Sequence, residues 1–168
     1  EWNNEDLSKL PIFEPGLQKI IAKTRNKNLF FTTQIKEMIE SADIIFISVN
    51  TPTKKKGLGA GKSSDLKWVE ASARQVARFA KGHTIVVEKS TLPVRTAEVI
   101  QSILNSSGSN TNKERNSFSV LSNPEFLAEG TAIKDLENPD RVLIGGEDKS
   151  AMLSLSKIYE NWVPKEKI

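Results

Sequence analysis

Three short polar segments of this sequence have the side chains that ligand binding and proton transfer require. Each segment lies at the end of a predicted strand, and the run before the first segment is nearly all apolar and largely β-branched, which is typical of a buried strand in a parallel sheet. A hydroxyl group both donates and accepts hydrogen bonds, and a carboxylate can accept a proton. The segments are Asn50-Thr51-Pro52-Thr53, Glu88-Lys89-Ser90-Thr91 and Ser122-Asn123-Pro124-Glu125.

Glu125 is the residue best placed to act as a base. It follows Pro124 at a predicted strand end, where a carboxylate can point into the crevice beside a parallel sheet. The alternative is a solvated turn glutamate. The Asn50-Thr51-Pro52 sequence is likewise ordinary turn chemistry as well as a candidate ligand contact. The residue types alone leave both alternatives open.

The elements that position these segments follow from the pattern of the chain. Short apolar runs alternate with longer amphipathic stretches, which predicts an α/β fold of the Rossmann-like, doubly wound type with a mostly parallel sheet. The carboxyl ends of parallel strands meet at one edge, so the three polar segments are expected to share one cleft. Strands are predicted over residues 28–32, 44–49, 84–88, 118–121 and 142–144, and helices over 34–41, 66–80, 93–104 and 149–162.

The composition is that of a globular protein and excludes several kinds of site. The 168 residues are 38% hydrophobic and 27% charged, with a net charge of +3. Cysteine is absent and His83 is the only histidine, so we expect no disulfide and no metal site. Basic residues are not interleaved with aromatics, which argues against nucleic-acid binding. No apolar run approaches the ~20 residues that span a bilayer, and we expect a cytoplasmic protein without a membrane partner.

The usual start of a dinucleotide-binding domain is missing from the pattern. Such a domain opens with a strand, a G-x-G-x-x-G turn and a helix, and the sequence has no such motif. The nearest glycine cluster, Gly57 to Gly61, has the wrong spacing and follows three lysines, so we interpret it as a plain loop. The chain also lacks an initiator methionine. We therefore expect a truncated sheet, without the first strands and the glycine-rich loop.

Five ordered segments are specific enough to indicate a family. The longest reads SNPEFLAEGTAIKDL from Ser122, and the others read LPIFEPGL from Leu10, FISVNTPT from Phe46, EKSTLPVR from Glu88 and NPDRVLIGG from Asn138. In residue identity, order and spacing they resemble the UDP-glucose 6-dehydrogenases, within the UDP-glucose/GDP-mannose dehydrogenase family. The resemblance covers nearly the whole chain. The residues AEGTAIKDL, from Ala128 to Leu136, are closer to the eukaryotic type than to GDP-mannose or UDP-N-acetylmannosamine dehydrogenases.

The resemblance implies an NAD-dependent enzyme that oxidises UDP-glucose to UDP-glucuronate in two hydride transfers. It implies that residues 1–168 are part of an NAD-binding domain, and that the central helix and the sugar-nucleotide domain are absent. The family's nucleophilic cysteine and active-site lysine would then lie beyond Ile168, which agrees with the lack of cysteine. We expect the chain alone to be inactive and the intact protein to be a homo-oligomer.

The family motifs also imply roles for individual residues. Glu125 resembles a carboxylate that activates water, and Thr91 resembles a threonine that orders a catalytic water. A helix cap is the alternative for Thr91 and a turn hydroxyl for Ser90. The implied cofactor contacts are Val49, Asn50, Thr51, Pro52, Thr53, Ser90 and Glu129, and the implied substrate contacts are Glu125, Phe126, Leu127, Ala128 and Glu129.

Further alternatives stay open from the sequence. Phe126 and Leu127 are apolar, so their side chains are expected to pack into the core and leave ligand contacts to the main chain. Lys89 either contributes to ligand electrostatics or is structural. The chain could also derive from a GDP-mannose or UDP-N-acetylmannosamine type of dehydrogenase, or be a catalytically dead binding or assembly module.

Overall fold

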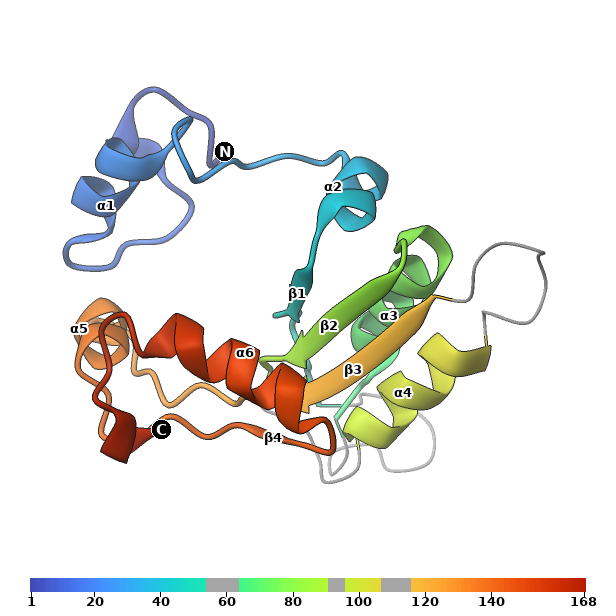
Figure 1. Cartoon of the computed structure of the whole chain (residues 1–168). Coiled ribbons are helices and arrows are strands. Elements are labelled where there is room, and N and C mark those ends of the chain that lie inside the picture. The colour runs from blue at the N-terminus through green and yellow to red at the C-terminus, as the bar shows by residue number, and fades with distance from the viewer. Residues whose placement is uncertain (54–63, 91–95, 107–115) are drawn as a thin grey trace.

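The computed structural model of the chain describes residues 1–53, 64–90, 96–106 and 116–168 (Figure 1). The Gly57 to Gly61 cluster, Thr91 and the helix start predicted at Pro93 lie outside the described residues. The elements below are therefore those of the four described ranges.

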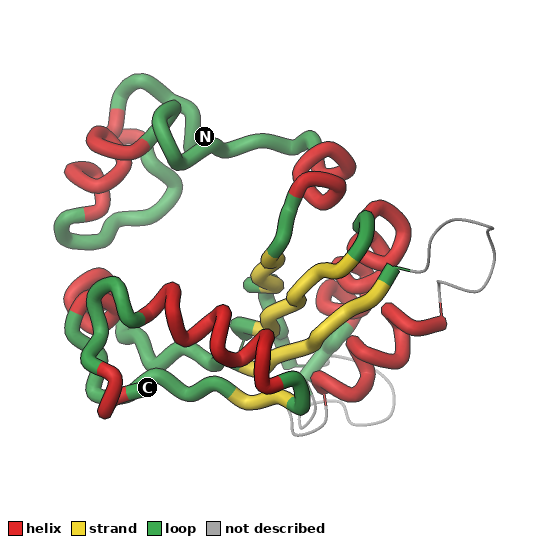
Figure 2. Tube along the Cα trace, viewed as in Figure 1, coloured by secondary structure: helices red, strands yellow, loops and turns green. Residues whose placement is uncertain are grey.

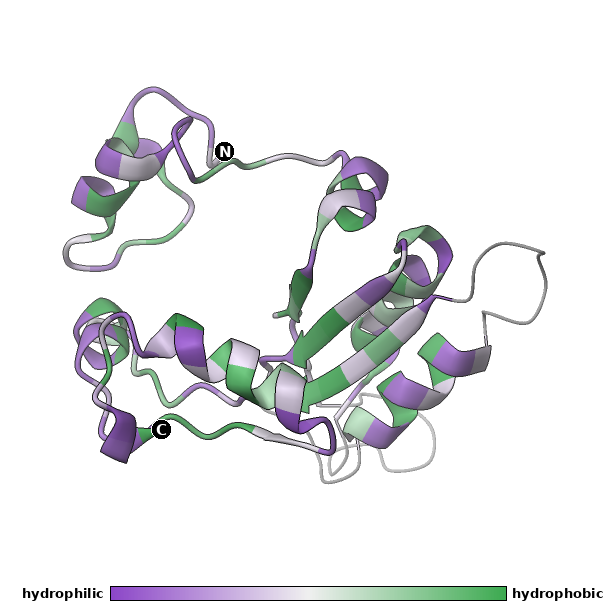
Figure 3. Cartoon of the chain, viewed as in Figure 1, coloured by the Kyte–Doolittle hydropathy of each residue, from purple (hydrophilic) through white to green (hydrophobic). Residues whose placement is uncertain are grey.

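The sheet has four strands in the order β1-β2-β3-β4. β1 (Ile44–Ile47), β2 (His83–Glu88) and β3 (Ser117–Ser122) are parallel to one another, and β4 (Gly145–Gly146) pairs antiparallel with β3. β1 is hydrophobic throughout (Figure 3), although only Ile47 is buried and Phe46 is 44% exposed. The predicted mostly parallel sheet is confirmed, and the carboxyl ends of its parallel strands lie at one edge.

Helices cover both faces of the sheet (Figure 1). α3 (Lys67–Phe79) and α4 (Thr96–Ser106) pack on one face, and α6 (Lys149–Tyr159) packs on the other. Val86 belongs to the first core and its neighbour Val87 to the second, because adjacent strand residues point to opposite faces. No helix in the described part of the chain combines the length and apolar character that crossing a membrane requires.

The strand predicted over residues 28–32 is wrong. The segment between α1 (Leu17–Thr24) and α2 (Ile35–Ser41) is a loop (Figure 2), in which Leu29 makes a single bridge with Arg25. An apolar run becomes a strand only where a neighbouring strand satisfies its backbone hydrogen bonds. The sheet extends from β1 to β4 without this segment, so its apolar residues have no ladder to join.

The strand predicted over residues 142–144 is also misplaced. The backbone amide of Val142 donates to the carbonyl of Lys167 (2.7 Å), next to the short helix η3 (Lys165–Lys167), and so does not join the sheet. The two following glycines pair with β3 instead, in the antiparallel direction. A tertiary contact with the C-terminal residues therefore decides where this strand begins.

Residues 1–34, here called the N-terminal segment, contain η1 (Leu7–Lys9) and α1 and lie apart from the sheet (Figure 1). The segment is joined internally by a few contacts. The Arg25 guanidinium donates to the carbonyls of Trp2 (3.1 Å) and Asn4 (2.7 Å), and the Trp2 ring stacks on Phe31 at 5.2 Å.

Glu14 connects the N-terminal segment to α5 (Ala132–Glu137). Its Oε2 accepts a hydrogen bond from the amide of Gly130 (3.0 Å) and its Oε1 accepts one from the amide of Ala132 (2.6 Å). A carboxylate at the start of a helix satisfies amides that have no partner within the helix. This residue belongs to the LPIFEPGL motif, so part of the motif is explained by packing.

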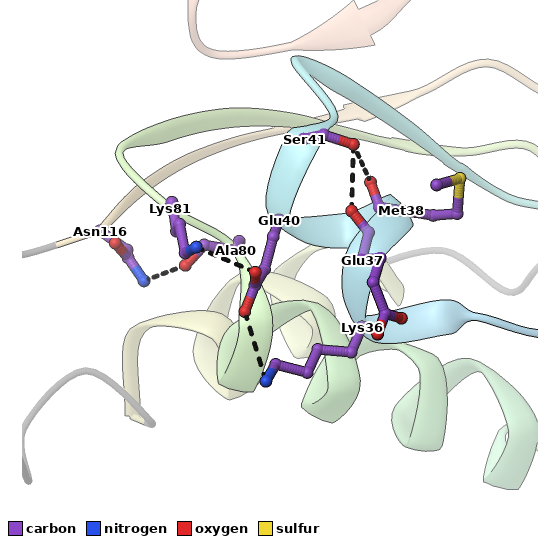
Figure 4. A network of polar contacts seen from close by, with 8 residues as sticks. All are labelled: Lys36, Glu37, Met38, Glu40, Ser41, Ala80, Lys81 and Asn116. Atoms are coloured by element: carbon purple, nitrogen blue, oxygen red, sulfur yellow. Dashed lines mark hydrogen bonds and ion pairs between the residues drawn. The ribbon is translucent and has the colours of Figure 1, made fainter.

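A polar network holds α2 against the connection between α3 and β2 (Figure 4). The Glu40 carboxylate accepts from Lys81 (2.9 Å) and lies 3.9 Å from the ammonium of Lys36. The Asn116 amide donates to the carbonyl of Ala80 (2.6 Å), where α3 ends. These contacts position α2 at the start of β1, away from the polar strand ends.

Candidate functional site

The carboxyl ends of β1, β2 and β3 border one cavity of about 690 Å³. Parallel strands deliver the residues that follow them to the same edge of the sheet. The predicted convergence of the three polar segments is therefore confirmed. The cavity is lined by Ser48, Val49, Asn50, Thr51, Lys89, Ser90, Glu125 and Leu127.

The turn after β1 is partly open to solvent, and its described contacts include the bond from the Asp65 amide to the Pro52 carbonyl (2.7 Å). The hydroxyl of Ser90, which is buried, donates to the carbonyl of Val49 (2.8 Å) and ties the ends of β1 and β2 together. Asn50 is exposed at the rim of the cavity. Pro52 and Thr53 are exposed too and are not among the lining residues, although both were predicted to contact the cofactor.

The turn after β3 is braced by Asn123, which is only 1% exposed. The side-chain amide of Asn123 donates to the carbonyl of Leu143 (2.7 Å) and accepts from the hydroxyl of Tyr159 (2.6 Å). Its backbone amide donates to the carbonyl of Glu88 (2.9 Å). Each polar group of this buried side chain is thus paired, and the Pro124-Glu125 peptide is held at a fixed place above the sheet.

Glu125 separates the strand-end cavity from a second cavity of about 470 Å³. Glu125, Lys89 and Leu127 line both cavities. The Oε2 atom of Glu125 is buried and has no hydrogen-bond partner among the described residues. A buried carboxylate oxygen of this kind is an acceptor that a water or a ligand hydroxyl can satisfy.

Two charged neighbours share the environment of Glu125. Burial raises the pKa of Glu88, the hydrogen bond from the Ser122 hydroxyl (3.2 Å) opposes the rise, and the charge of Glu125 adds to it. Burial lowers the pKa of the Lys89 ammonium, and the charge of Glu125 opposes that fall. Glu125 therefore acts on a carboxyl and an ammonium at once, at the edge where the cavities meet.

The predicted burial of Phe126 and Leu127 is wrong. Phe126 is 51% exposed and Leu127 is 41% exposed, and both line the second cavity. The guanidinium of Arg141 lies 4.9 Å from the centre of the Phe126 ring, a cation–π arrangement. Asn123 is buried in the core, whereas the side chains of Phe126 and Leu127 line the cavity.

Two other predicted ligand contacts lie outside both cavities. Glu129 is exposed in the turn before α5 and is not a lining residue of either. The amide of Ala128 donates to the Asp135 carboxylate (3.1 Å), and its carbonyl accepts from the amide of Thr131 (3.1 Å), so its main chain is used within the turn. Unlike Glu125 and Leu127, these two residues do not line the cavities.

Sequence analysis missed the residues that hold the site in place. Tyr159 is in α6 and its hydroxyl reaches Asn123 from 36 positions along the chain. Burial raises the pKa of this phenol, and the hydrogen bond to Asn123 opposes the rise. The asparagine of the SNPEF segment was the available signal, because a buried side-chain amide requires several partners.

Comparison with known proteins places the chain in a family. The family model described as UDP-glucose/GDP-mannose dehydrogenase family, NAD binding domain, matches residues 2–163. The chain is 56% identical to the UDP-glucose 6-dehydrogenase of Caenorhabditis elegans over 172 residues and 53% identical to that of Gallus gallus over 171 residues. These matches cover 100% and 99% of this chain, and 35% and 33% of the relatives. The chain therefore spans about a third of their length.

Solved structures give the same result. A UDP-glucose dehydrogenase from Pyrobaculum islandicum superposes with a TM-score of 0.75 at 33% identity, over 91% of this chain and 34% of the other. A ternary complex of GDP-mannose dehydrogenase from Pseudomonas aeruginosa superposes with a TM-score of 0.78 at 33% identity, over 90% and 34%. Sequence match and fold therefore agree. The chain belongs to the UDP-glucose/GDP-mannose dehydrogenase family and carries sequence of its NAD-binding domain.

Proposed function

We propose that the protein containing this chain oxidises UDP-glucose to UDP-glucuronate with NAD, and that this chain supplies the nucleotide cleft and Glu125. The observation that carries the proposal is the single cavity at which three parallel strand ends meet. Dinucleotides bind in such crevices, at the carboxyl ends of strands. The cavity volume of about 690 Å³ also lies within the range usual for cofactor sites.

The lining residues fit a dinucleotide. Val49, Asn50 and Thr51 offer an exposed turn with backbone and side-chain hydrogen-bonding groups, and Ser90 fixes this turn through the Val49 carbonyl. NAD bound here would supply the hydride acceptor. Pro52, Thr53 and Glu129 extend the proposed contacts beyond the cavity, on the strength of the family motifs.

Glu125 is proposed to hold and activate water beside the reacting carbon. Its Oε2 is buried without a hydrogen-bond partner among the described residues, and Glu125 lines both cavities, which supports this role. Thr91 follows Ser90 directly in the chain, and we propose that its hydroxyl orders the same water. A hydroxyl can accept and donate at once, so it positions water without being a base.

The second cavity is proposed to receive the sugar nucleotide. Lys89 and Arg141 line it as cations that can pair with an anionic substrate, beside the carboxylates of Glu125, Asp135 and Asp140. Phe126 and Leu127 provide apolar surface. Ala128 is proposed to contact the substrate through its carbonyl oxygen, which has a second lone pair beside the one that accepts from the Thr131 amide. UDP-glucose is favoured because UDP-glucose 6-dehydrogenases match this chain at 53–56% identity over 99–100% of its length.

The test is NADH formation by the complete protein that contains this chain, with UDP-glucose, GDP-mannose and UDP-N-acetylmannosamine as separate substrates. We expect turnover of UDP-glucose and none by the 168-residue chain alone. Glu125→Gln should lower kcat by about 10²–10⁴-fold, the usual contribution of a general base, and the exposed Glu137→Gln should not. Absence of turnover with all three substrates would instead support the binding or assembly module.

The family membership also supports a cytoplasmic homo-oligomer. Measuring the mass of the complete protein in solution by light scattering tests the oligomeric state, and a monomer at micromolar concentration would refute it.

A further inference from the structure

The edge of β3 that faces away from β2 is only partly covered by another strand. β3 has six residues, and β4 pairs with the last two of them, Leu121 and Ser122. Among the described residues no other strand pairs with this side of β3 (Figure 1). Residues 117–120 therefore leave about 13 Å of strand edge open, at about 3.3 Å a residue.

Backbone amides of β3 point toward this open edge. The Ser117 amide donates to the carbonyl of Gly82 (2.9 Å), on the β2 side. The amides of successive strand residues point to opposite sides of the strand, so those of Phe118 and Val120 face away from β2. A row of unpaired backbone groups of this kind is a template on which another strand can form.

A cavity of about 510 Å³ lies along this edge, and we call it the edge groove. Three consecutive residues of β3, Phe118, Ser119 and Val120, line it. Successive strand residues point to opposite faces of a sheet, so a cavity that touches all three lies beside the strand and not over one face. The other lining residues are Ala97, Glu98, Gln101, Ser122, Gly145, Gly146, Glu147 and Asp148.

The edge groove has a wall on each face of the sheet. α4 packs on one face and contributes Ala97, Glu98 and Gln101. On the other face lies Asp148, whose carboxylate caps α6 and accepts from the hydroxyl of Ser119. An extended chain between these walls would keep its backbone beside β3 and point its side chains alternately toward α4 and the start of α6.

The edge groove is acidic. Glu98, Glu147 and Asp148 line it, and no lysine or arginine of the described ranges does, although the net charge of the chain is +3. Pairing this edge with the same edge of a second copy would bring like charges together, which is unfavourable. A segment with lysine or arginine at alternate positions would instead place cations against these carboxylates.

We infer that the edge groove binds an extended basic segment of a partner protein, which adds a strand to the sheet beside β3. Hydrogen bonds to the backbone of Phe118 and Val120 supply affinity, and the alternate basic side chains supply specificity. The edge groove shares no lining residue with the two cavities of the proposed active site. The inference therefore goes beyond the proposed function and does not depend on it.

The test measures fluorescence polarisation of the labelled peptides KVKVKV, KPKPKP and EVEVEV with the complete protein that contains this chain. We expect saturable binding of KVKVKV and none of EVEVEV. KPKPKP has the same charge, but its prolines cannot donate to a strand ladder. It should bind at least about tenfold more weakly, as expected for the loss of one or two backbone hydrogen bonds. Equal affinities for KVKVKV and KPKPKP would overturn the inference, because charge alone would then explain binding.

Hydrogen exchange followed by mass spectrometry locates the bound peptide in the wild-type protein. KVKVKV should slow exchange of the amides in residues 117–122 and leave those of β1 unchanged. Two other results would each overturn the inference. Protection of 117–122 that rises with protein concentration would make a second copy the occupant. Protection without peptide at every concentration, together with no peptide binding, would show that the rest of the complete protein covers the edge.

A charge reversal tests the acidic wall. Glu147 is exposed, so Glu147→Lys leaves the core intact and replaces an attraction by a repulsion. It should weaken KVKVKV binding about fivefold or more. The matched change Glu137→Lys, at an exposed position of α5 outside the edge groove, should leave the affinity within about twofold. Equal effects of the two variants would contradict binding at this edge. NADH formation by the complete protein is scored separately, so failure of either proposal leaves the other standing.

Discussion

The turns after β1 and β3 border the same cavity but are held in different ways. Asn123, in the turn after β3, is 1% exposed and bonded to Leu143, Tyr159 and Glu88. The turn after β1 has an exposed Asn50 and a bond from Ser90 to a backbone carbonyl. The braced turn holds the backbone before Glu125 in place, whereas the turn after β1 leaves the side chain of Asn50 exposed to solvent.

The comparison would break if the two asparagines were equally important for stability. We expect Asn123→Ala to lower the free energy of unfolding by about 1–3 kcal/mol, because it leaves the buried Tyr159 hydroxyl without its partner and removes the donor to the Leu143 carbonyl. Asn50→Ala, at an exposed position, should change it by about 0.5 kcal/mol or less. Urea denaturation of both variants measures the difference.

A smaller effect is expected from Tyr159, whose hydroxyl donates to the side chain of Asn123. Tyr159→Phe removes only the hydroxyl that donates to Asn123, and should cost about 1 kcal/mol of unfolding free energy. In the Asn123→Ala background the same change should cost much less, since its partner is already gone. Full additivity in this double-mutant cycle, measured in urea, would show that the two residues do not act together.

The buried carboxyl of Glu88, at the end of β2, should make the stability of this region depend on pH. The pKa of Glu88 is raised by burial, so its stabilising protonated form is fully present below the ordinary glutamate value of 4.5. The free energy of unfolding should then decline as pH rises from that value through the raised pKa. Glu88→Gln should reduce this decline in urea titrations at a series of pH values, and an unchanged slope would contradict it.

The smallest expected effect is on the electrostatic coupling of Glu125 to Glu88 and Lys89. Glu125→Gln removes a negative charge, so the pKa of Lys89 and the pKa of Glu88 should both fall. Side-chain NMR titrations of the two groups measure this. The matched change Glu129→Gln, four residues along and exposed, should move neither, and equal shifts in both variants would refute a specific coupling.

Much of the fold and the location of the cleft could be predicted from local pattern. The run Ile44 to Val49 and the run Thr84 to Glu88 are largely apolar and rich in β-branched residues, and both contain parallel strands. Parallel strands necessarily bring Asn50, Ser90 and Glu125 to one edge. This inference needed only strand direction, which the alternation with helices indicates.

Tertiary contacts explain what could not be predicted. Residues 28–32 have the sequence of a strand but no neighbouring strand to pair with, apart from one bridge between Leu29 and Arg25. The last strand is formed by Gly145 and Gly146, and not by residues 142–144, because the two glycines pair with β3. The exposure of Phe126 and the bond from Tyr159 to Asn123 depend on how distant segments meet. The roles of Glu125 and Thr91 in catalysis stay predictions.

The hydrogen bonds of Glu14 have a consequence for how the chain folds. They join residues 116 and 118 positions apart, whereas β2 and β3 pair across about a third of that separation. Closing a long loop costs more chain entropy than closing a short one, and contacts of high sequence separation slow folding. We therefore expect the sheet to assemble first and the N-terminal segment to dock last, as a late kinetic step onto α5.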